Sequence, residues 1–421
     1  MTTSFINRLQ NRRGFLRNAQ HILTGKIIAA LFGLLTFIFI ARGFTPSEVG
    51  DYQYLLSLII LCALLASWGL NEYIFRECSQ KIERANEYFV VLRAIKYRNW
   101  SAFGSVLVLV VWSLHSWREA LLASLLVLMM VYDAQTVSAN VILRARRETH
   151  AESWLLPLRA FARFFAAFVI YLFALQISLT GLAVFFVLIN MLVYFYYLRR
   201  FFSNLGTVKS PSLRESASYM RAARHYGLIG LVSGIYLHGI SVMVKWWQGA
   251  EAVAYIAVPL QVYGALLFIP IALGLALIPR LSPLYLSDFT RWSHLSRKIT
   301  IVAAVVFLPF TLVCYFVLPK LIPVLFGEKY GNSVLFTEVF IVMFYFRAVT
   351  EAILLPALFS AKRENAYLKF LIAVVLIFLI GAQIVLYQRS LLELVYLMLA
   401  TEVILTFGLG ILLFRVVKKN V

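Results

Sequence analysis

The sequence predicts an all-α polytopic membrane protein, with twelve transmembrane helices arranged as two six-helix lobes around a central cavity. Hydrophobic residues make up 62% of the 421-residue chain and charged residues only 14%, which is more apolar surface than a soluble domain of this size needs. Apolar runs of about 20 residues, the length that crosses a bilayer as a helix, recur along the whole chain. Because these runs are continuous rather than alternating, they favour helices over a β-barrel.

A basic amphipathic segment, residues 1–21, begins the chain. Its apolar residues, such as Phe5 and Leu9, are interspersed with Arg8 and Arg12, which predicts a helix lying in the membrane interface ahead of an uncleaved first span. The twelve expected spans that follow are each continuous and apolar, and they cover 22–41, 52–71, 99–115, 120–142, 154–175, 179–198, 226–244, 252–278, 299–319, 334–360, 370–387 and 391–413.

A polar interval at the middle of the chain divides these spans into two groups of six. We therefore expect an N-lobe, a cytoplasmic linker, a C-lobe and a cytoplasmic tail, at 22–198, 199–225, 226–413 and 414–421. The same pattern, Glu-x-x-x-Tyr, opens the second span of each lobe, as Glu48 to Tyr52 and Glu251 to Tyr255, at an offset of 203 residues. Either this five-residue match is a coincidence or the lobes are parallel repeats related by an axis along the membrane normal.

The net charge of +20 first suggests nucleic acid, but its distribution argues for membrane topology. Of the 39 Lys and Arg residues, 29 lie in the two termini and in every second loop, 6 lie in the alternate loops, and 4 fall inside spans. By the positive-inside rule, this asymmetry places both termini in the cytoplasm. We expect membrane lipids, and not nucleic acid, as partners of the remaining basic surface.

The residues offer little that resembles enzyme chemistry. The chain has no GxSxG, Walker, HExxH or dinucleotide-binding motif. Cys62, Cys78 and Cys314 form no CxxC pair, so they predict neither a disulfide framework nor a metal site. We therefore predict a protein that is not an enzyme and needs no cofactor or metal.

Cationic side chains inside the expected spans are the most informative candidates. Arg159 and Arg163 lie four residues apart, on one face of a helix, in a stretch where a charge costs about 2.5–3.5 kcal/mol. Arg159 is close enough to the cytoplasmic surface to reach the headgroups instead, and Lys26 has the same alternative. Arg347 has Glu351 four residues on, which predicts either an anion anchor switched by a carboxylate or a self-neutralising pair.

Two further carboxylates lie deep in expected spans. Asp133 and Glu402 have no evident partner on their own helices. A buried carboxyl group is easier to protonate, so these two and Glu351 are candidates for coupling transport to an ion, with a structural hydrogen bond to another helix as the alternative.

Three short motifs lie at the ends of expected spans: Ala41-Arg42-Gly-Phe-Thr-Pro46-Ser-Glu-Val-Gly50-Asp-Tyr52, Trp68-Gly69-Leu70, and Leu325-Phe326-Gly327-Glu-Lys-Tyr330. In this order and spacing, with twelve spans and a basic lead, the chain resembles, over essentially its whole length, the polysaccharide flippases of the multidrug/oligosaccharidyl-lipid/polysaccharide (MOP) exporter superfamily. It departs from the family at Phe44-Thr45, where Leu-Gly is common.

This resemblance implies a V-shaped, MATE-like transporter of the bacterial inner membrane. The implied substrate is an undecaprenyl-diphosphate-linked oligosaccharide, moved to the periplasmic leaflet by alternating access and ion antiport, for O-antigen of lipopolysaccharide, enterobacterial common antigen or capsule. The implied partners are this lipid-linked oligosaccharide and the polymerase and chain-length regulator of the same pathway. Arg159, Arg163, Arg347 and Lys26 would be counter-charges for the anionic diphosphate.

Two other readings remain open at this point. A drug or cation antiporter of the same superfamily would need an acidic cavity, whereas the intramembrane charges here lean basic. A membrane glycosyltransferase or polymerase would need larger loops than the longest expected here, which have about 25 residues. Peptidoglycan-precursor flippases, which are related, generally have extra spans that this chain lacks.

Overall fold

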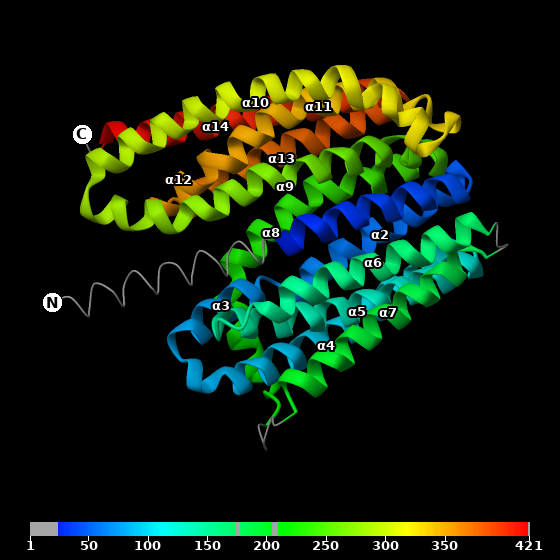
Figure 1. Cartoon of the computed structure of the whole chain (residues 1–421), viewed down its shortest axis with the longest axis horizontal. Helices are drawn as coiled ribbons and strands as arrows, with labels where there is room; N and C mark the ends of the chain where they lie inside the picture. The colour runs from blue at the N-terminus through cyan, green and yellow to red at the C-terminus, as the bar shows by residue number, and fades with distance from the viewer. Residues whose placement is uncertain (1–23, 174–176, 204–208, 420–421) are drawn as a thin grey trace. The chain divides into compact units, whose positions relative to one another are not determined.

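The structure is a computed structural model that describes residues 24–173, 177–203 and 209–419. The interfacial helix expected at 1–21 lies outside the described residues. The helices, in chain order, are Thr24–Gly43, α2 (Pro46–Ser67), α3 (Leu70–Gln80), η1 (Ile82–Arg84), α4 (Ala85–Leu114), α5 (Trp117–Ala145), α6 (His150–Leu172), α7 (Leu179–Phe201), α8 (Leu213–Gln248), α9 (Ala250–Ser287), α10 (Phe289–Phe326), η2 (Glu328–Tyr330), α11 (Ser333–Val349), the π-helix η3 (Thr350–Leu354), α12 (Leu355–Ser360), α13 (Glu364–Tyr387) and α14 (Leu391–Lys419) (Figure 1).

The prediction of an all-α polytopic membrane protein is confirmed. Within the described residues, eleven helices are long and apolar enough to cross a membrane, and there is no β-strand. The remaining expected span, 99–115, forms the second half of α4, whose first half contains charged residues such as Arg93 and Arg98. Helix α8 begins at Leu213, so it includes the second half of the segment expected as a linker.

The chain divides into two compact units, which we call unit 1 and unit 2. Unit 1 comprises Met1–Gly43 and Leu55–Gly239, and unit 2 comprises Phe44–Tyr54 and Ile240–Val421. Of the three boundaries, one follows Gly43 and lies between two helices, and the other two fall inside α2 and α8.

The core of unit 1 includes a cluster of buried side chains from α3, α4, α5, α7 and α8. Phe89 of α4 stacks on Phe202, which follows α7, with ring centroids 3.8 Å apart. Gly69 lies between α2 and α3 with a φ of 68°, a left-handed conformation that favours glycine. A Cβ at Gly69 would lie 2.4 Å from the backbone nitrogen of Gly227, so the Trp68-Gly69 motif lets α8 approach the α2–α3 break.

The core of unit 2 is the continuous run α11–η3–α12. The apolar window of this run is 72% buried, compared with 22–33% for α9, α10, α13 and α14. Tyr263 of α9 packs edge-on against Phe340 of α11 at 5.7 Å. By contrast, α10 exposes large apolar side chains such as Val305 and Phe316, each 64% accessible, as expected of a surface that faces lipid.

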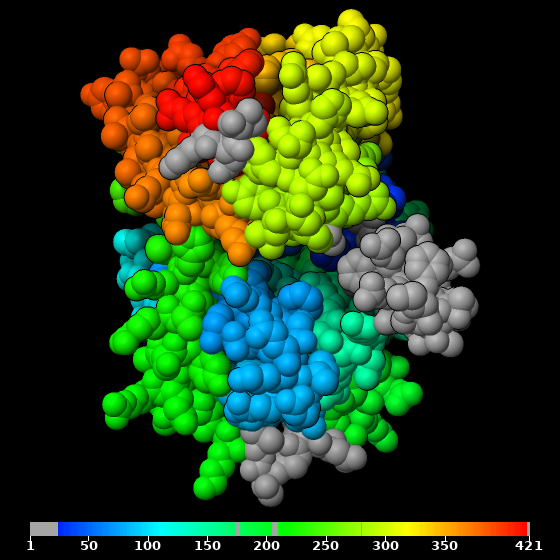
Figure 2. Space-filling model, turned by 90° about the vertical axis from the view of Figure 1, so that its left-hand side faces the viewer, coloured from blue at the N-terminus to red at the C-terminus, as the bar shows by residue number. Residues whose placement is uncertain are grey.

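The basic connections of unit 2 lie at one end of it. Figure 2 shows this end, with the α9–α10 connection in yellow-green, the α12–α13 connection in orange and the C-terminal part of α14 in red. These segments contain the basic residues expected at 279–298, at 361–369 and after 413. The arrangement agrees with the alternation of basic and less basic connections on which the topology prediction depends.

The two longer motifs meet in unit 2. Thr45 and Glu48 form a capping box at the start of α2, with Thr45 N to Glu48 Oε2 at 2.9 Å and Glu48 N to Thr45 Oγ1 at 3.3 Å, and Pro46 occupies the first helical position. Lys329 donates to the carbonyl oxygen of Phe44 at 2.5 Å and so joins segments 285 residues apart. Burial lowers the pKa of the Lys329 ammonium, and nearby Glu48 opposes that effect.

Gly50 has a tertiary role that its place in the motif does not reveal. A Cβ at this position would lie 1.7 Å from the carbonyl oxygen of Ala250, so only glycine allows α2 to pack against the start of α9. Asp51 forms an ion pair with Lys245 at the end of α8 in the same region. The motif thus fixes the α8–α9 connection of unit 2.

Candidate functional site: charged clusters within the helices

In unit 1, the first arginine of the predicted pair has an acidic partner on a neighbouring helix. Arg159 of α6 forms an ion pair with Asp133 of α5, and their side chains are 12% and 25% accessible. The structure therefore brings together an expected anion anchor and an expected coupling carboxylate. Each neutralises the other, which reduces the cost of holding either charge within a span.

The second arginine contacts a different helix. Nη2 of Arg163 donates to Oδ1 of Asn190 on α7 at 2.5 Å, and its guanidinium lies 5.9 Å from the centre of the Phe186 ring. Asn190 is fully buried and donates in turn to the carbonyl oxygen of Met129 at 3.0 Å. Arg159, Arg163 and Asp133 together have a formal charge of +1.

A buried lysine lies in the core of unit 1. Lys96 of α4 has no accessible surface, and its ammonium donates to Asn71 Oδ1 at 2.7 Å, Ser138 Oγ at 2.9 Å and the carbonyl oxygen of Ala134 at 3.1 Å. These three bonds use all its donors and tie α4 to α3 and α5.

Sequence reasoning missed Lys96 by placing it in a loop. The signal was present, because Lys96 lies four residues from both Leu92 and Trp100, which are 0% and 2% accessible and define the buried face of α4. Sequence reasoning also missed Asn190, the partner of Arg163. A single amide in an apolar run does not show which residue of another helix it will contact.

Lys26 lies in helix Thr24–Gly43, close to charged groups at the end of α5 and the start of α6. It interacts electrostatically with Arg144 and Glu152, which form an ion pair with each other, with Arg144 Nε to Glu152 Oε2 at 2.6 Å. Gly25 is the residue before Lys26. A Cβ at Gly25 would lie 2.8 Å from the backbone carbonyl oxygen of Ser153, so this helix packs tightly on α6.

In unit 2, one arginine is shared by two carboxylates. Arg347 of α11 contacts Glu351 of η3 at 2.8 Å and Glu402 of α14 at 3.5 Å. Glu402 is fully buried, and the Arg347 and Glu351 side chains are 14% and 17% accessible. The cluster has a formal charge of −1 when both carboxylates are ionised, so it has no net positive charge with which to hold an anion.

The π-helix sets the geometry of this cluster. η3 interrupts the α-helical run at Thr350–Leu354, a distortion often found at functional sites. The hydroxyl of Thr350 lies 2.9 Å from that of Thr406 on α14. A Cβ at Gly274 of α9 would lie 2.2 Å from the carbonyl oxygen of Glu351, so glycine is needed for α9 to pack against the π-turn.

The comparisons with known proteins agree with this fold. The family model described as polysaccharide biosynthesis protein matches residues 15–285. Among curated proteins, no sequence matches this chain.

Solved structures resemble the chain over nearly its whole length. A MOP superfamily transporter from Pyrococcus furiosus, described as having a binding pocket of reverse polarity, is 12% identical with a TM-score of 0.68, covering 96% of both chains. The lipid II flippase MurJ in an inward closed conformation is 11% identical with a TM-score of 0.68, covering 91% of this chain and 85% of that one. An inward-facing multidrug resistance MATE transporter is 13% identical with a TM-score of 0.67, covering 95% and 100%.

Proposed function

This chain belongs to the polysaccharide biosynthesis protein family, and we propose that it is a flippase for a lipid-linked oligosaccharide. Its substrate would be an oligosaccharide repeat unit on undecaprenyl diphosphate, moved by alternating access from the cytoplasmic to the periplasmic leaflet of a bacterial inner membrane. The product would feed the biosynthesis of O-antigen, common antigen or capsule. Both termini would then lie in the cytoplasm.

The observation that carries this proposal is the pair of arginines on one face of α6 in a membrane-spanning bundle of this family. A guanidinium matches the oxygens of a phosphate group through two parallel hydrogen bonds. Arg163 is the better candidate, because Arg159 is engaged by a full negative charge on Asp133. The excess charge of +1 on these three side chains favours an anionic group such as the diphosphate.

The cluster of unit 2 supports a role in ion coupling. With both carboxylates ionised, Arg347, Glu351 and Glu402 sum to −1, and one bound proton makes the cluster neutral. Proton binding would loosen the hold of the carboxylates on Arg347 and on the adjoining π-turn. Glu351 and Glu402 are therefore our candidates for the antiport step.

The same negative cluster favours the second candidate, a cation or drug antiporter of the MOP superfamily. A buried carboxylate attracts a cationic substrate, whereas the arginines of unit 1 repel it. The two candidates thus depend on different units of the molecule and differ in the sign of the cargo.

Reconstituted transport separates these candidates. The purified chain is placed in proteoliposomes with a labelled undecaprenyl-diphosphate oligosaccharide, and the sugar that reaches the outer leaflet is cleaved by an enzyme that cannot cross the membrane. We expect transfer that depends on the protein and falls in Arg163→Ala. Ethidium uptake without any transfer of the lipid would overturn the proposal in favour of the antiporter.

A further inference from the structure

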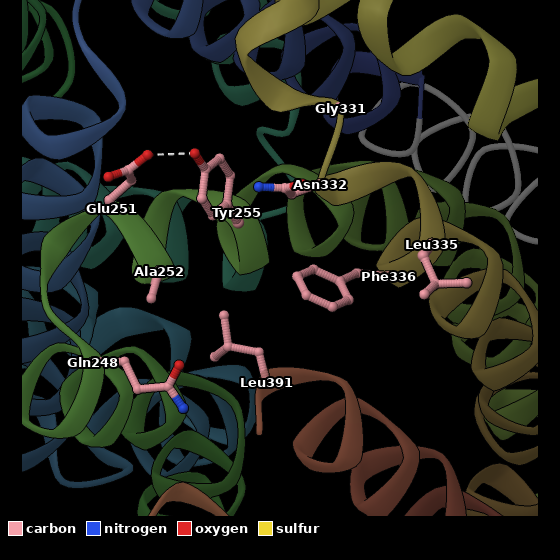
Figure 3. A pocket seen from close by; sticks show the side chains of 9 residues that line it. All are labelled: Gln248, Glu251, Ala252, Tyr255, Gly331, Asn332, Leu335, Phe336 and Leu391. Carbon is pink, nitrogen blue, oxygen red and sulfur yellow. Dashed lines mark hydrogen bonds between the residues drawn. The ribbon is translucent and has the colours of Figure 1, made fainter. Parts of the chain in front are cut away.

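Unit 2 contains a cavity that the charged clusters do not use. It has a volume of about 650 Å³, within the range of about 300–1,000 Å³ typical of small-molecule sites. Figure 3 shows its lining, which comes from the end of α8, the start of α9, the start of α11 and the start of α14: Gln248, Glu251, Ala252, Tyr255, Gly331, Asn332, Leu335, Phe336 and Leu391.

Polar groups form one wall of this cavity. The Tyr255 hydroxyl donates to the Glu251 carboxylate one turn earlier on α9, and the Asn332 amide points toward Tyr255 from the other side (Figure 3). The hydroxyl of Ser333 donates to the carbonyl oxygen of Tyr255 at 2.9 Å, which holds the start of α11 against α9. The carboxylate, phenol and amide are thus held in a row.

Apolar side chains form the opposite wall. Phe336 turns its ring into the cavity, toward the side where Ala252 and Leu391 lie (Figure 3). Gln248 lies at the edge of this wall, and its buried Nε2 has no hydrogen-bond acceptor among the described residues.

The backbone that carries these groups is fixed by the motif that contains Gly50. Gly249 links α8 and α9 with a φ of 87°, which favours glycine. Gly50 packs against the backbone of Ala250, the first residue of α9. This contact fixes the start of α9 and therefore the place of Glu251, the next residue. The cavity is therefore built into the fold rather than formed by loose side chains.

The chemistry of the lining selects the ligand. Glu251 is the only charged residue of the nine that line the cavity, so a diphosphate or an acidic sugar is repelled. A carboxylate, two amides and a phenol offer both donors and acceptors, which suits neighbouring hydroxyl groups, and the ring of Phe336 suits the apolar face of a pyranose. We propose that this cavity binds uncharged sugar residues.

The position of the cavity indicates on which side of the membrane it would bind sugar. Its lining comes from the three connections of unit 2 that lie opposite the basic ones, which the topology prediction assigns to the periplasm. If the proposed flippase function holds, the cavity receives the sugar part of the substrate on the release side, while the arginines of unit 1 handle the diphosphate. The ligand of the cavity itself is testable without any lipid.

The test uses the full-length chain in lipid nanodiscs and saturation-transfer NMR with soluble probes. The probes are triacetylchitotriose as an uncharged sugar, trigalacturonate as an acidic one and tetraphenylphosphonium as an organic cation. We expect saturable binding of triacetylchitotriose alone. Tighter binding of either charged probe, or no binding of the neutral trisaccharide, would overturn the assignment.

Variants tie the binding to the cavity. Glu251→Gln and Asn332→Ala change exposed residues and should weaken binding by about 5- to 10-fold, the loss of one hydrogen bond. Gln388→Ala, an exposed amide in the α13–α14 connection outside the lining, is the matched control and should bind as the unmodified chain does. Equal affinities in all three variants would place the sugar elsewhere.

Transport of the lipid-linked oligosaccharide separates this inference from the proposed function. A chain that flips the lipid but binds no neutral sugar disproves the cavity assignment and leaves the flippase intact. A chain that binds the sugar in this cavity but flips no lipid disproves the flippase and leaves the cavity assignment standing.

Discussion

The ion pair between Arg159 and Asp133 allows stability and transport to be measured separately. Replacing one partner of a buried pair leaves the other charge uncompensated, at a cost of about 3–5 kcal/mol. Because 25% of the Asp133 side chain and 12% of the Arg159 side chain remain accessible, we expect each single change, Asp133→Ala or Arg159→Met, to cost less, about 2–3 kcal/mol.

The double variant is the informative one. With both charges gone, no uncompensated charge remains in the span, so its loss of stability should be smaller than the sum of the two single losses by about 1–2 kcal/mol. The assay is reversible unfolding by SDS titration in mixed micelles, followed by helical circular dichroism. Losses that add up without coupling would refute the reasoning, because they would mean that the two charges do not hold each other in the folded protein.

Transport by the double variant then assigns the role of Arg159. If the pair only joins α5 to α6, the double variant should flip the lipid-linked oligosaccharide about as fast as the unmodified chain. If Arg159 also docks the diphosphate, transport should remain low although stability has returned. The Arg159→Lys variant is the control, because it keeps the charge but not the planar fork.

Three further outcomes are expected. Arg163→Ala should reduce flipping by about 10-fold or more in proteoliposomes, while the amount of inserted protein is unchanged. Arg163→Lys should restore only part of the activity, because one ammonium does not replace a two-bond contact. Full activity of the Ala variant would remove Arg163 from the site. Glu402→Gln should change the pH dependence of transport, since it removes a carboxyl group that we propose as the proton carrier next to Arg347, and an unchanged pH profile would make it a packing residue. Gly50→Ala should destabilise the protein by about 1–3 kcal/mol in the SDS titration, because the new Cβ meets a backbone oxygen. Gly410→Ala is the control and should not destabilise it, because no atom lies within 4 Å of its new Cβ. Equal stabilities would contradict the packing of α2 on α9.

The candidate residues show where prediction from sequence stops. The pair of Arg347 and Glu351 was predicted because it lies four residues apart on one helix, a spacing that sequence reveals. The contacts of Arg347 with Glu402 and of Arg159 with Asp133 join different helices, 55 and 26 residues apart, and no local rule connects them. Lys96 was misplaced because a charge count treats every lysine as exposed, although the apolar face of its helix marked it as buried.

The motifs were recognised before their physical role was known. The sequence indicated a family through Thr45-Pro-Ser-Glu48, Gly50 and Leu325 to Tyr330, but only the structure explains why these residues are needed. They cap α2, let it pack against α9 and join η2 to the carbonyl of Phe44. The result is the backbone that supports the cavity of Figure 3.

The sequence by itself determined the class of the protein and its helices, because bilayer thickness and backbone hydrogen bonding make these properties local. It also determined the alternation of the basic connections, and its short motifs indicated the family. The tertiary structure alone decided which charges are paired, which groups bind the Lys96 ammonium, and that Glu251, Tyr255 and Asn332 line one cavity. These depend on side chains from helices distant in the chain meeting at a few ångströms. In a protein whose helices are uniformly apolar, the sequence shows which residues are exceptional, and packing decides which of them act together.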